Sequence, residues 1–259
     1  MTTEGFVLSR RAFLGVATAA LSLPACLPDL TGTSGDPVLR SRPIAPTGLV
    51  LTGRFPLGLG DSRDGFLYIP DGHDLTAALP LLVLLHGAGD GSSFWTRPEF
   101  ELERLANERG LLILALDSRG TSWDVVMRRE FGADSAFIDQ ALEQTFSRCR
   151  VDPMRIGLAG FSDGATTALS LSLANGGLFS QLGAFSPGFV ADGKRVGKPR
   201  IFVSHGIRDG VFPIASTGRP IVSKLRQAGY QVELQEFDGP HTVPFDKLVR
   251  VMDRLVNGV

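Results

Sequence analysis

Cysteine is scarce in this sequence, with only Cys26 and Cys149 among 259 residues. No two cysteines lie close together, and no cysteine lies beside a histidine cluster, so no zinc motif is indicated. The histidines are also few, and their spacing is too wide for a local metal motif: His73, His86, His205 and His241. We therefore expect no bound metal.

An excess of either charge is missing as well. The chain has 26 lysines and arginines against 27 aspartates and glutamates, a formal net charge of −1. Such a balance lacks the basic stripe of a nucleic-acid-binding protein. No internal repeat, dinucleotide-binding fingerprint or phosphate-binding glycine loop occurs, so we expect neither a nucleic acid partner nor a cofactor. The length fits one large or two small α/β domains with a sizeable core.

The apolar run near the N-terminus is too short to span a bilayer comfortably. Residues 9–26, "SRRAFLGVATAALSLPAC", combine an arginine pair, an apolar stretch and a cysteine, which fits a signal peptide better than a membrane helix. The start resembles the twin-arginine export signal of bacteria, and the end resembles a lipobox with Cys26 as the lipidated residue. An amphipathic helix is the alternative. We expect an exported bacterial protein, periplasmic or anchored to a membrane by its lipid, with Cys149 as its remaining cysteine.

The stretch after this predicted signal peptide has no hydrophobic periodicity. Residues 27–48 are rich in proline, glycine, serine and threonine, a composition typical of a flexible tether. The chain is thus divided into a signal peptide over residues 1–26, a tether over 27–48 and a folded domain over 49–259.

Apolar runs and helical patterns alternate through the folded part. We expect strands over residues 65–70, 79–87, 111–118, 155–161, 182–186, 200–206 and 231–237. We expect helices over residues 97–110, 133–148, 163–177, 215–229 and 244–258. This alternation predicts an α/β fold with a mostly parallel sheet. In such sheets ligands bind beyond the carboxyl ends of the strands.

A serine between two glycines lies at one of these strand ends. "GLAGFSDGAT", residues 157–166, places Ser162 where a buried strand meets a helix with almost no loop between them. A turn this tight needs small neighbours, such as Gly160 and Gly164, and it lifts the hydroxyl to the top of the sheet. We therefore interpret Ser162 as a nucleophile. The alternative is a serine that only caps the helix.

A serine hydroxyl needs a base to take its proton. His241, in the loop "DGPHTVP" after the last expected strand, is the best candidate, and the other histidines are expected to be packed or solvated. Asp209, in "SHGIRDGVFP", is the candidate carboxylate that orients the base. Asp209 could instead be only a turn residue, and Asp192 and Asp238 are rival acids.

The stretch "LLHGAGDG" supplies a candidate oxyanion hole after the strand over residues 79–87. The backbone N–H of Ala88 pairs there with the N–H of Asp163, the residue after the nucleophile. Gly87 and Gly89 let the backbone come close.

From about residue 65 onward, the chain resembles the α/β-hydrolases of the phospholipase/carboxylesterase kind, with feruloyl-esterase-like and dienelactone-hydrolase-like relatives. The matching stretches are "LLHGAGD", "LDSRGTSWD", "VDPMRIGLAGFSDG", "SHGIRDGVFP" and "DGPHTVP". The resemblance implies one α/β-hydrolase domain with helices on both faces of the sheet. It also implies Ser162 as nucleophile, Asp209 as acid and His241 as base. Ala165 departs from the pattern, because many relatives carry a second glycine there.

The expected substrate follows from the loops. Residues 117–135 form the only sizeable irregular insert, which is too short for a large helical lid. An open site favours small, short-acyl or aryl esters. Aromatic residues that could line its rim are Trp95, Trp123, Phe131, Phe189 and Phe212. Alternatives are a polyester depolymerase, a polysaccharide-ester esterase, a prolyl-oligopeptidase-like peptidase and a non-catalytic binding lipoprotein on the same fold.

Overall fold

The computed structural model of the chain describes residues 37–46, 51–60, 62–74 and 76–258. The predicted signal segment with Cys26 lies outside these residues, as does the first part of the predicted tether. Cys149 is a buried free thiol, and burial raises its pKa to about 11.

Within the described residues, eight strands form one sheet in the order β1-β2-β4-β3-β5-β6-β7-β8. Strand β2 pairs antiparallel with β1 and β4, and every other pairing is parallel. The strands are β1 (Gly53–Pro56), β2 (Gly65–Ile69), β3 (Leu79–Leu85), β4 (Leu112–Leu116), β5 (Val151–Phe161), β6 (Gln181–Phe185), β7 (Arg200–Gly206) and β8 (Val232–Phe237). The mostly parallel sheet confirms the predicted fold class. The short edge strand β1 was not predicted.

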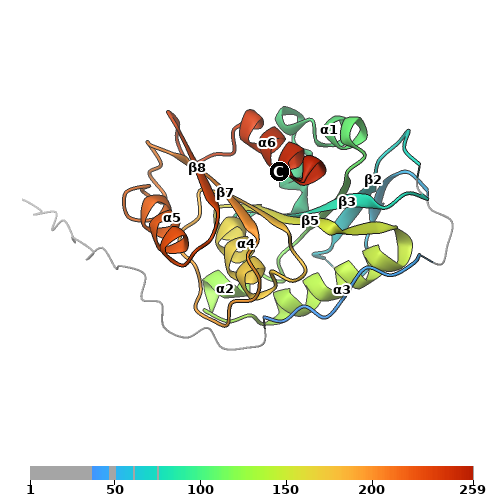
Figure 1. Ribbon diagram of the computed structural model, residues 1–259, viewed down its shortest axis with the longest axis horizontal. Helices are drawn as coiled ribbons and strands as arrows, with labels where there is room; N and C mark the ends of the chain where they lie inside the picture. Colours follow the sequence, from blue (N-terminus) through green and yellow to red (C-terminus); the bar gives the residue numbers. More distant parts are fainter. Residues whose placement is uncertain (1–36, 47–50, 61, 75, 259) are drawn as a thin grey trace, which may run out of the picture.

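Helices cover both faces of this sheet (Figure 1). They are α1 (Leu102–Arg109), α2 (Asp124–Met127), α3 (Ala133–Arg148), α4 (Asp163–Ala174), α5 (Gly218–Gln227) and α6 (Phe245–Asn257). One hydrophobic core joins the sheet to α2, α3, α4 and α5, and a second joins the other face to α1 and α6. Strands β3, β4, β6 and β7 are buried along nearly their whole length. Continuous apolar runs form such strands because both faces of the sheet are covered.

Several predicted bounds differ from the structure, among them that of strand β5, which begins at Val151 instead of residue 155. The helix expected over residues 97–110 begins only at Leu102, because Glu101 adopts a left-handed conformation with φ of 44° after a 3-10 turn over Pro98–Phe100. The insert expected to be irregular over residues 117–135 contains the short helix α2, which packs against α4.

The prediction of a flexible tether over residues 27–48 is wrong for its described part at residues 37–41. Leu39 is 1% exposed and belongs to the core under α4. Its N–H donates to Asn175 Oδ1 at 2.8 Å, and the N–H groups of Arg40 and Ser41 both donate to Asp139 Oδ1 at 2.9 Å. In Figure 1 this blue segment runs beside α3. It docks at the end of α4 opposite Ser162.

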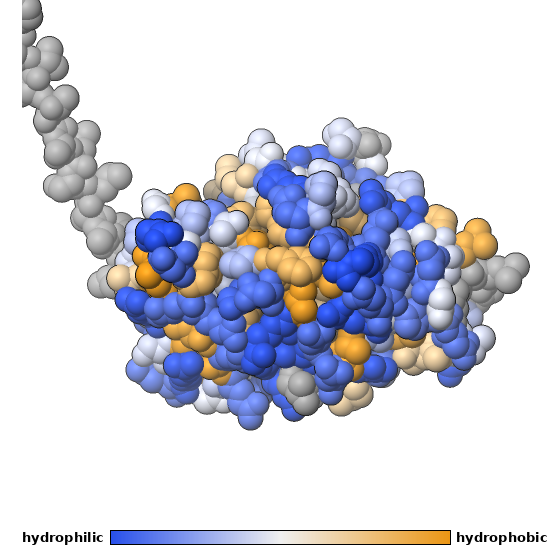
Figure 2. Space-filling view, turned by 90° about the horizontal axis from the view of Figure 1, so that it is seen from above, coloured by the Kyte–Doolittle hydropathy of each residue, from blue (hydrophilic) through white to orange (hydrophobic). Residues whose placement is uncertain are grey.

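The outer surface over α1 and α6 is mostly polar (Figure 2). Hydrophobic side chains appear there as separate small patches between hydrophilic ones. Such scattered patches are ordinary for a protein surface. No described helix is long and apolar enough to cross a membrane.

Candidate active site

Ser162 is the single residue between strand β5 and helix α4. Its φ of 55° and ψ of −117° are strained for a residue with a side chain. A Cβ at Gly160 would lie 2.3 Å from the carbonyl oxygen of Gly164, and one at Gly164 would lie 2.4 Å from the carbonyl oxygens of Leu85 and His86. Both positions therefore require glycine, as the tight strand-to-helix turn predicts.

Three side chains from three strand ends form one hydrogen-bonded line. His241 Nε2 lies 2.8 Å from Ser162 Oγ, and His241 Nδ1 lies 2.6 Å from Asp209 Oδ2. Because a carboxylate only accepts hydrogen bonds, Nδ1 carries the imidazole proton and Nε2 is left to accept from the serine hydroxyl. Ser162 is 7% exposed and Asp209 is 5% exposed. The structure thus brings together the three residues that the sequence singled out.

The Asp209 carboxylate is held from both sides. Its Oδ1 accepts the backbone N–H groups of Val211 at 2.9 Å and Phe212 at 2.8 Å. Burial alone would raise the pKa of Asp209, but the hydrogen bonds from His241 and these amides outweigh burial and lower that pKa. The carboxylate is therefore ionised at neutral pH. The rival Asp238 lies at the surface, where it pairs with Arg208.

A second histidine contacts the same carboxylate, and sequence reasoning missed this contact. His205 Nε2 lies 2.7 Å from the carbonyl oxygen of Phe212 and 3.2 Å from Asp209 Oδ2. The His205 side chain is fully buried. Burial lowers the pKa of His205, although the Phe212 carbonyl and Asp209 act in the opposite direction. His205 is therefore neutral, with its Nε2 proton pointing toward these two oxygens.

We expect this buried histidine to make the protein less stable in mild acid. The unfolded chain takes up a proton near pH 6.5, whereas the folded-state pKa of His205 lies lower. The resulting stability is complete above about pH 6.5 and is lost as pH falls toward the folded-state pKa. His205→Gln offers an amide N–H in place of the ring N–H and cannot gain this proton. Thermal unfolding between about pH 8 and about pH 5 should show a smaller drop in Tm for this variant than for the wild type. Parallel Tm curves would contradict the assignment.

Two backbone N–H groups near Ser162 have no hydrogen-bond acceptor in the described chain. Asp163 is the first residue of α4, so its N–H has no partner within the helix. Ala88 follows β3, in the loop where a Cβ at Gly87 would lie 3.4 Å from the Cβ of Ser162. No described residue accepts a hydrogen bond from the N–H of Ala88 or of Asp163. The role of these two N–H groups as an oxyanion hole stays a prediction.

The loop that carries Ala88 is braced by His86. The His86 ring is fully buried, its Nδ1 lies 2.6 Å from the carbonyl oxygen of Gly87, and its Nε2 accepts the N–H of Ser118 at 3.0 Å. Burial lowers the pKa of His86, with the Gly87 carbonyl opposing it. His86 is thus a packed, neutral histidine, as expected from the sequence.

The predicted rim contained two tryptophans that the structure places in the core. Trp95 and Trp123 are both 0% exposed, so neither presents its ring to a substrate, contrary to expectation. Trp95 packs against Phe185, and the indole N–H of Trp123 donates to the carbonyl oxygen of His86 at 2.8 Å. Phe131 is also buried, at 5% exposed. Large aromatic rings contribute strongly to a core because they bury a large apolar surface, and these three rings lie in the core.

The other aromatic residues lie nearer the surface. The Phe212 ring stands edge-on to the His241 ring at 5.5 Å, and it is partly exposed. Phe189 is half-buried under the guanidinium of Arg129, which lies 3.7 Å from the ring centroid. Sequence reasoning missed Phe161, whose ring lies 4.8 Å from His241. Its place immediately before the nucleophile was the available signal.

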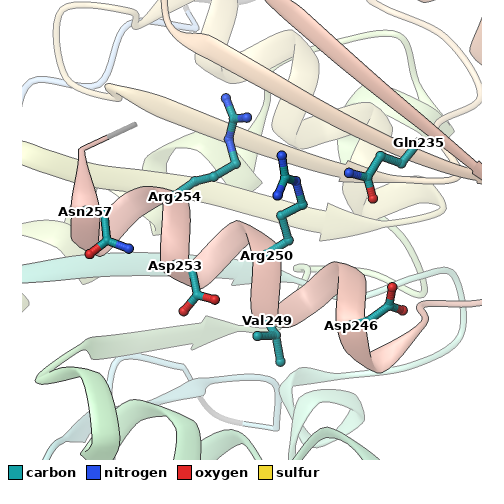
Figure 3. A pocket seen from close by; sticks show the side chains of 7 residues that line it. All are labelled: Gln235, Asp246, Val249, Arg250, Asp253, Arg254 and Asn257. Atoms are coloured by element: carbon teal, nitrogen blue, oxygen red, sulfur yellow. The ribbon is translucent and has the colours of Figure 1, made fainter.

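A separate surface pocket lies between α6 and β8 (Figure 3). It shares no residue with the Ser162–His241–Asp209 line, and its arginines Arg250 and Arg254 both bind Glu233. In the described part of the chain, no group of three or more histidine, cysteine, aspartate or glutamate side chains is placed to hold a metal ion.

Comparison with known proteins adds one sequence relative. No family model matches the chain. Over 162 residues it is 28% identical to feruloyl esterase C of Emericella nidulans, and this stretch covers 60% of the chain. The match spans 57% of the length of that esterase, little more than half of it.

Solved structures resemble the chain over a larger part of its length. S-formylglutathione hydrolase of Staphylococcus aureus matches with a TM-score of 0.62 at 16% identity, over 81% of this chain and 100% of that one. Propionate-bound esterase 2 of Thermogutta terrifontis matches with a TM-score of 0.60 at 19% identity, over 80% and 94%. Both likenesses extend over about four fifths of this chain, which includes most of its sheet. The chain therefore has the α/β-hydrolase fold.

Proposed function

We propose that the chain is a serine hydrolase that cleaves carboxylic esters. The observation that carries this proposal is the line from Ser162 Oγ through His241 to the buried Asp209 carboxylate. This geometry activates a hydroxyl as a nucleophile, and a binding module has no need of it. The named activities of the sequence relative and of the structural neighbours, all acting on ester or thioester bonds, support the same reaction class.

The mechanism follows from the positions of these groups. Ser162 Oγ attacks the ester carbonyl carbon while His241 Nε2 takes the hydroxyl proton. The negative charge that develops on the carbonyl oxygen faces the N–H groups of Ala88 and Asp163. The alcohol then leaves with the proton from His241, and the acyl group stays on Ser162. A water molecule gives its proton to His241 and its oxygen to the acyl carbon, which releases the acid and restores the serine.

The substrate class that we propose is a short-acyl or aryl ester. The insert over residues 117–135 contributes only the short helix α2, so the described chain places no large helical lid over Ser162. Partly exposed aromatic rings at Phe161 and Phe212 flank His241. The name of the feruloyl esterase relative supports an aryl acyl group.

A panel of esters tests this proposal. Acetate, butyrate and laurate esters of p-nitrophenol, together with methyl ferulate, would be compared by kcat/KM. We expect the acetate, butyrate and ferulate to exceed the laurate by about tenfold or more, because no lid shelters a long chain. A maximum at laurate would contradict the substrate class, and no turnover of any ester would contradict the activity.

We also propose that the protein is exported and held at a membrane through Cys26. The support is the sequence pattern of residues 9–26. The chain from residue 37 docks at the end of α4 remote from Ser162, so only residues 27–36 would link the anchor to the domain, with a reach of at most about 35 Å.

The anchor is tested by the Cys26→Ser variant. We expect this variant to move from the membrane fraction to the soluble fraction, because the thiol that would carry the lipid is gone. The Cys149→Ser variant is the matched control and should stay with the membranes. Recovery of Cys26→Ser in the membrane fraction would show that something else holds the protein there.

A further inference from the structure

A short segment between β4 and α2 contacts both the loop after β3 and the start of helix α4, which carry the two candidate oxyanion donors. The carbonyl oxygen of Thr121 accepts the N–H of Gly89 at 2.8 Å. The indole N–H of Trp123 donates to the carbonyl oxygen of His86 at 2.8 Å. Ala88 lies between His86 and Gly89, so the segment holds the backbone on both sides of this donor.

The residue between these two contacts reaches the other donor. Ser122 Oγ donates to Asp163 Oδ2 at 2.5 Å, and the two residues are 4% and 8% exposed. Asp163 begins α4, and its own N–H is the second candidate donor. Thr121–Trp123 therefore binds the loop after β3 and the start of α4 at the same time.

We propose that Thr121–Trp123 is a clamp that sets the separation of the Ala88 and Asp163 N–H groups, with Ser122 as its positioning residue. Oxyanion donors act only when they are fixed before the charge develops, and a displacement of about 1 Å can cost about 100-fold in rate. The two donors belong to different segments, the loop after β3 and the start of α4, and Thr121–Trp123 makes hydrogen bonds to both of them. The clamp rests on the proposed esterase function.

The clamp predicts a particular kinetic signature. Ser122→Ala removes the hydrogen bond to the Asp163 carboxylate. Trp123→Phe keeps an aromatic ring but removes the hydrogen bond to the carbonyl oxygen of His86. Each should lower kcat by about 10- to 100-fold while KM stays within about twofold, because the lost interaction acts in the transition state. The inhibition constant of an aryl trifluoromethyl ketone, whose adduct with Ser162 carries an oxyanion, should rise by the same factor as kcat falls.

Ser170→Ala is the matched control. Ser170 is a buried serine of α4 whose hydroxyl donates to the carbonyl oxygen of Thr166, away from both donors. This variant should lower Tm and leave kcat and the ketone inhibition constant near the wild-type values. Its Tm also shows how much of the Ser122→Ala effect comes from general loss of stability.

The outcomes separate the clamp from the function on which it rests. Ester hydrolysis by the wild type and its loss in Ser162→Ala would support the esterase function. If both folded clamp variants then match the wild type, the clamp proposal is wrong and the esterase function is unaffected. A rise in KM without a fall in kcat, or an equal kcat loss in Ser170→Ala, also overturns the clamp. If the wild type hydrolyses no ester, both proposals fall. Should one clamp variant not fold, the other decides.

Discussion

Replacing Ser162 with alanine is expected to lower kcat/KM for ester hydrolysis by at least about 10,000-fold, because the attacking oxygen is lost and the rest of the triad has nothing to activate. In free energy this is about 5.5 kcal/mol of transition-state stabilisation. The fold should survive, since alanine fits the φ of 55° no worse than serine does. Steady-state kinetics on the best ester of the panel, with Tm measured beside it, gives both quantities.

A second serine in the same region serves as the control for Ser162→Ala. Ser172 lies later in the same helix, is fully buried, and its hydroxyl has no hydrogen-bond partner among the described residues. Ser172→Ala should keep kcat/KM within about twofold of the wild type. Equal activity in Ser162→Ala and the wild type would show that Ser162 is not the nucleophile.

The second large effect is expected at Asp209. In Asp209→Asn the amide oxygen can still accept the N–H groups of Val211 and Phe212, which leaves the amide NH₂ facing His241 Nδ1. A donor there favours the tautomer with the proton on Nε2, and that tautomer cannot take the proton of Ser162. We expect kcat to fall by about 10,000-fold.

The same substitution also turns a donor toward His205, whose Nε2 lies 3.2 Å from the replaced oxygen. We therefore expect a lower Tm for Asp209→Asn, in contrast to Ser162→Ala. The surface variant Asp238→Asn is the control, because Asp238 pairs only with exposed Arg208 in the described chain, and it should keep near-normal kcat. A kcat for Asp209→Asn within tenfold of the wild type, or a large loss in Asp238→Asn, would contradict the assignment of the acid.

Much of the architecture could be predicted because its causes are local. Continuous apolar runs bounded by turn residues predicted the buried parallel strands, and the helix over Ala133–Arg148 and the strand over Arg200–Gly206 agree with the structure residue for residue. The tight turn at Ser162 could also be predicted locally. Gly160 and Gly164 are visible in the sequence, and only glycine allows the backbone to pack as closely as it does at these two positions. The left-handed Glu101 that delays helix α1 carries no such signal, because glutamate ordinarily favours a helix.

The remaining features depend on residues far apart in the chain. Leu39 is buried because Asn175 and Asp139, about 100 or more positions away, bind the backbone around it. The contact of His205 with Asp209 and that of Ser122 with Asp163 arise only once the strands are aligned. Local composition predicted that the stretch around Leu39 is a flexible tether and that Trp95 lines the site, but both side chains are buried. Composition alone cannot show which side of a segment is covered by the rest of the fold.

The most direct test of the central claim is to label the chain with a fluorophosphonate and to map the modified peptide by mass spectrometry. An activated serine attacks phosphorus, its oxygen forms a bond to phosphorus, and fluoride leaves. We predict one modified residue, Ser162, in the wild type, and no labelling of Ser162→Ala or of His241→Ala. Equal labelling of the wild type and Ser162→Ala, or modification at another serine, would contradict the claim that Ser162 is the activated nucleophile.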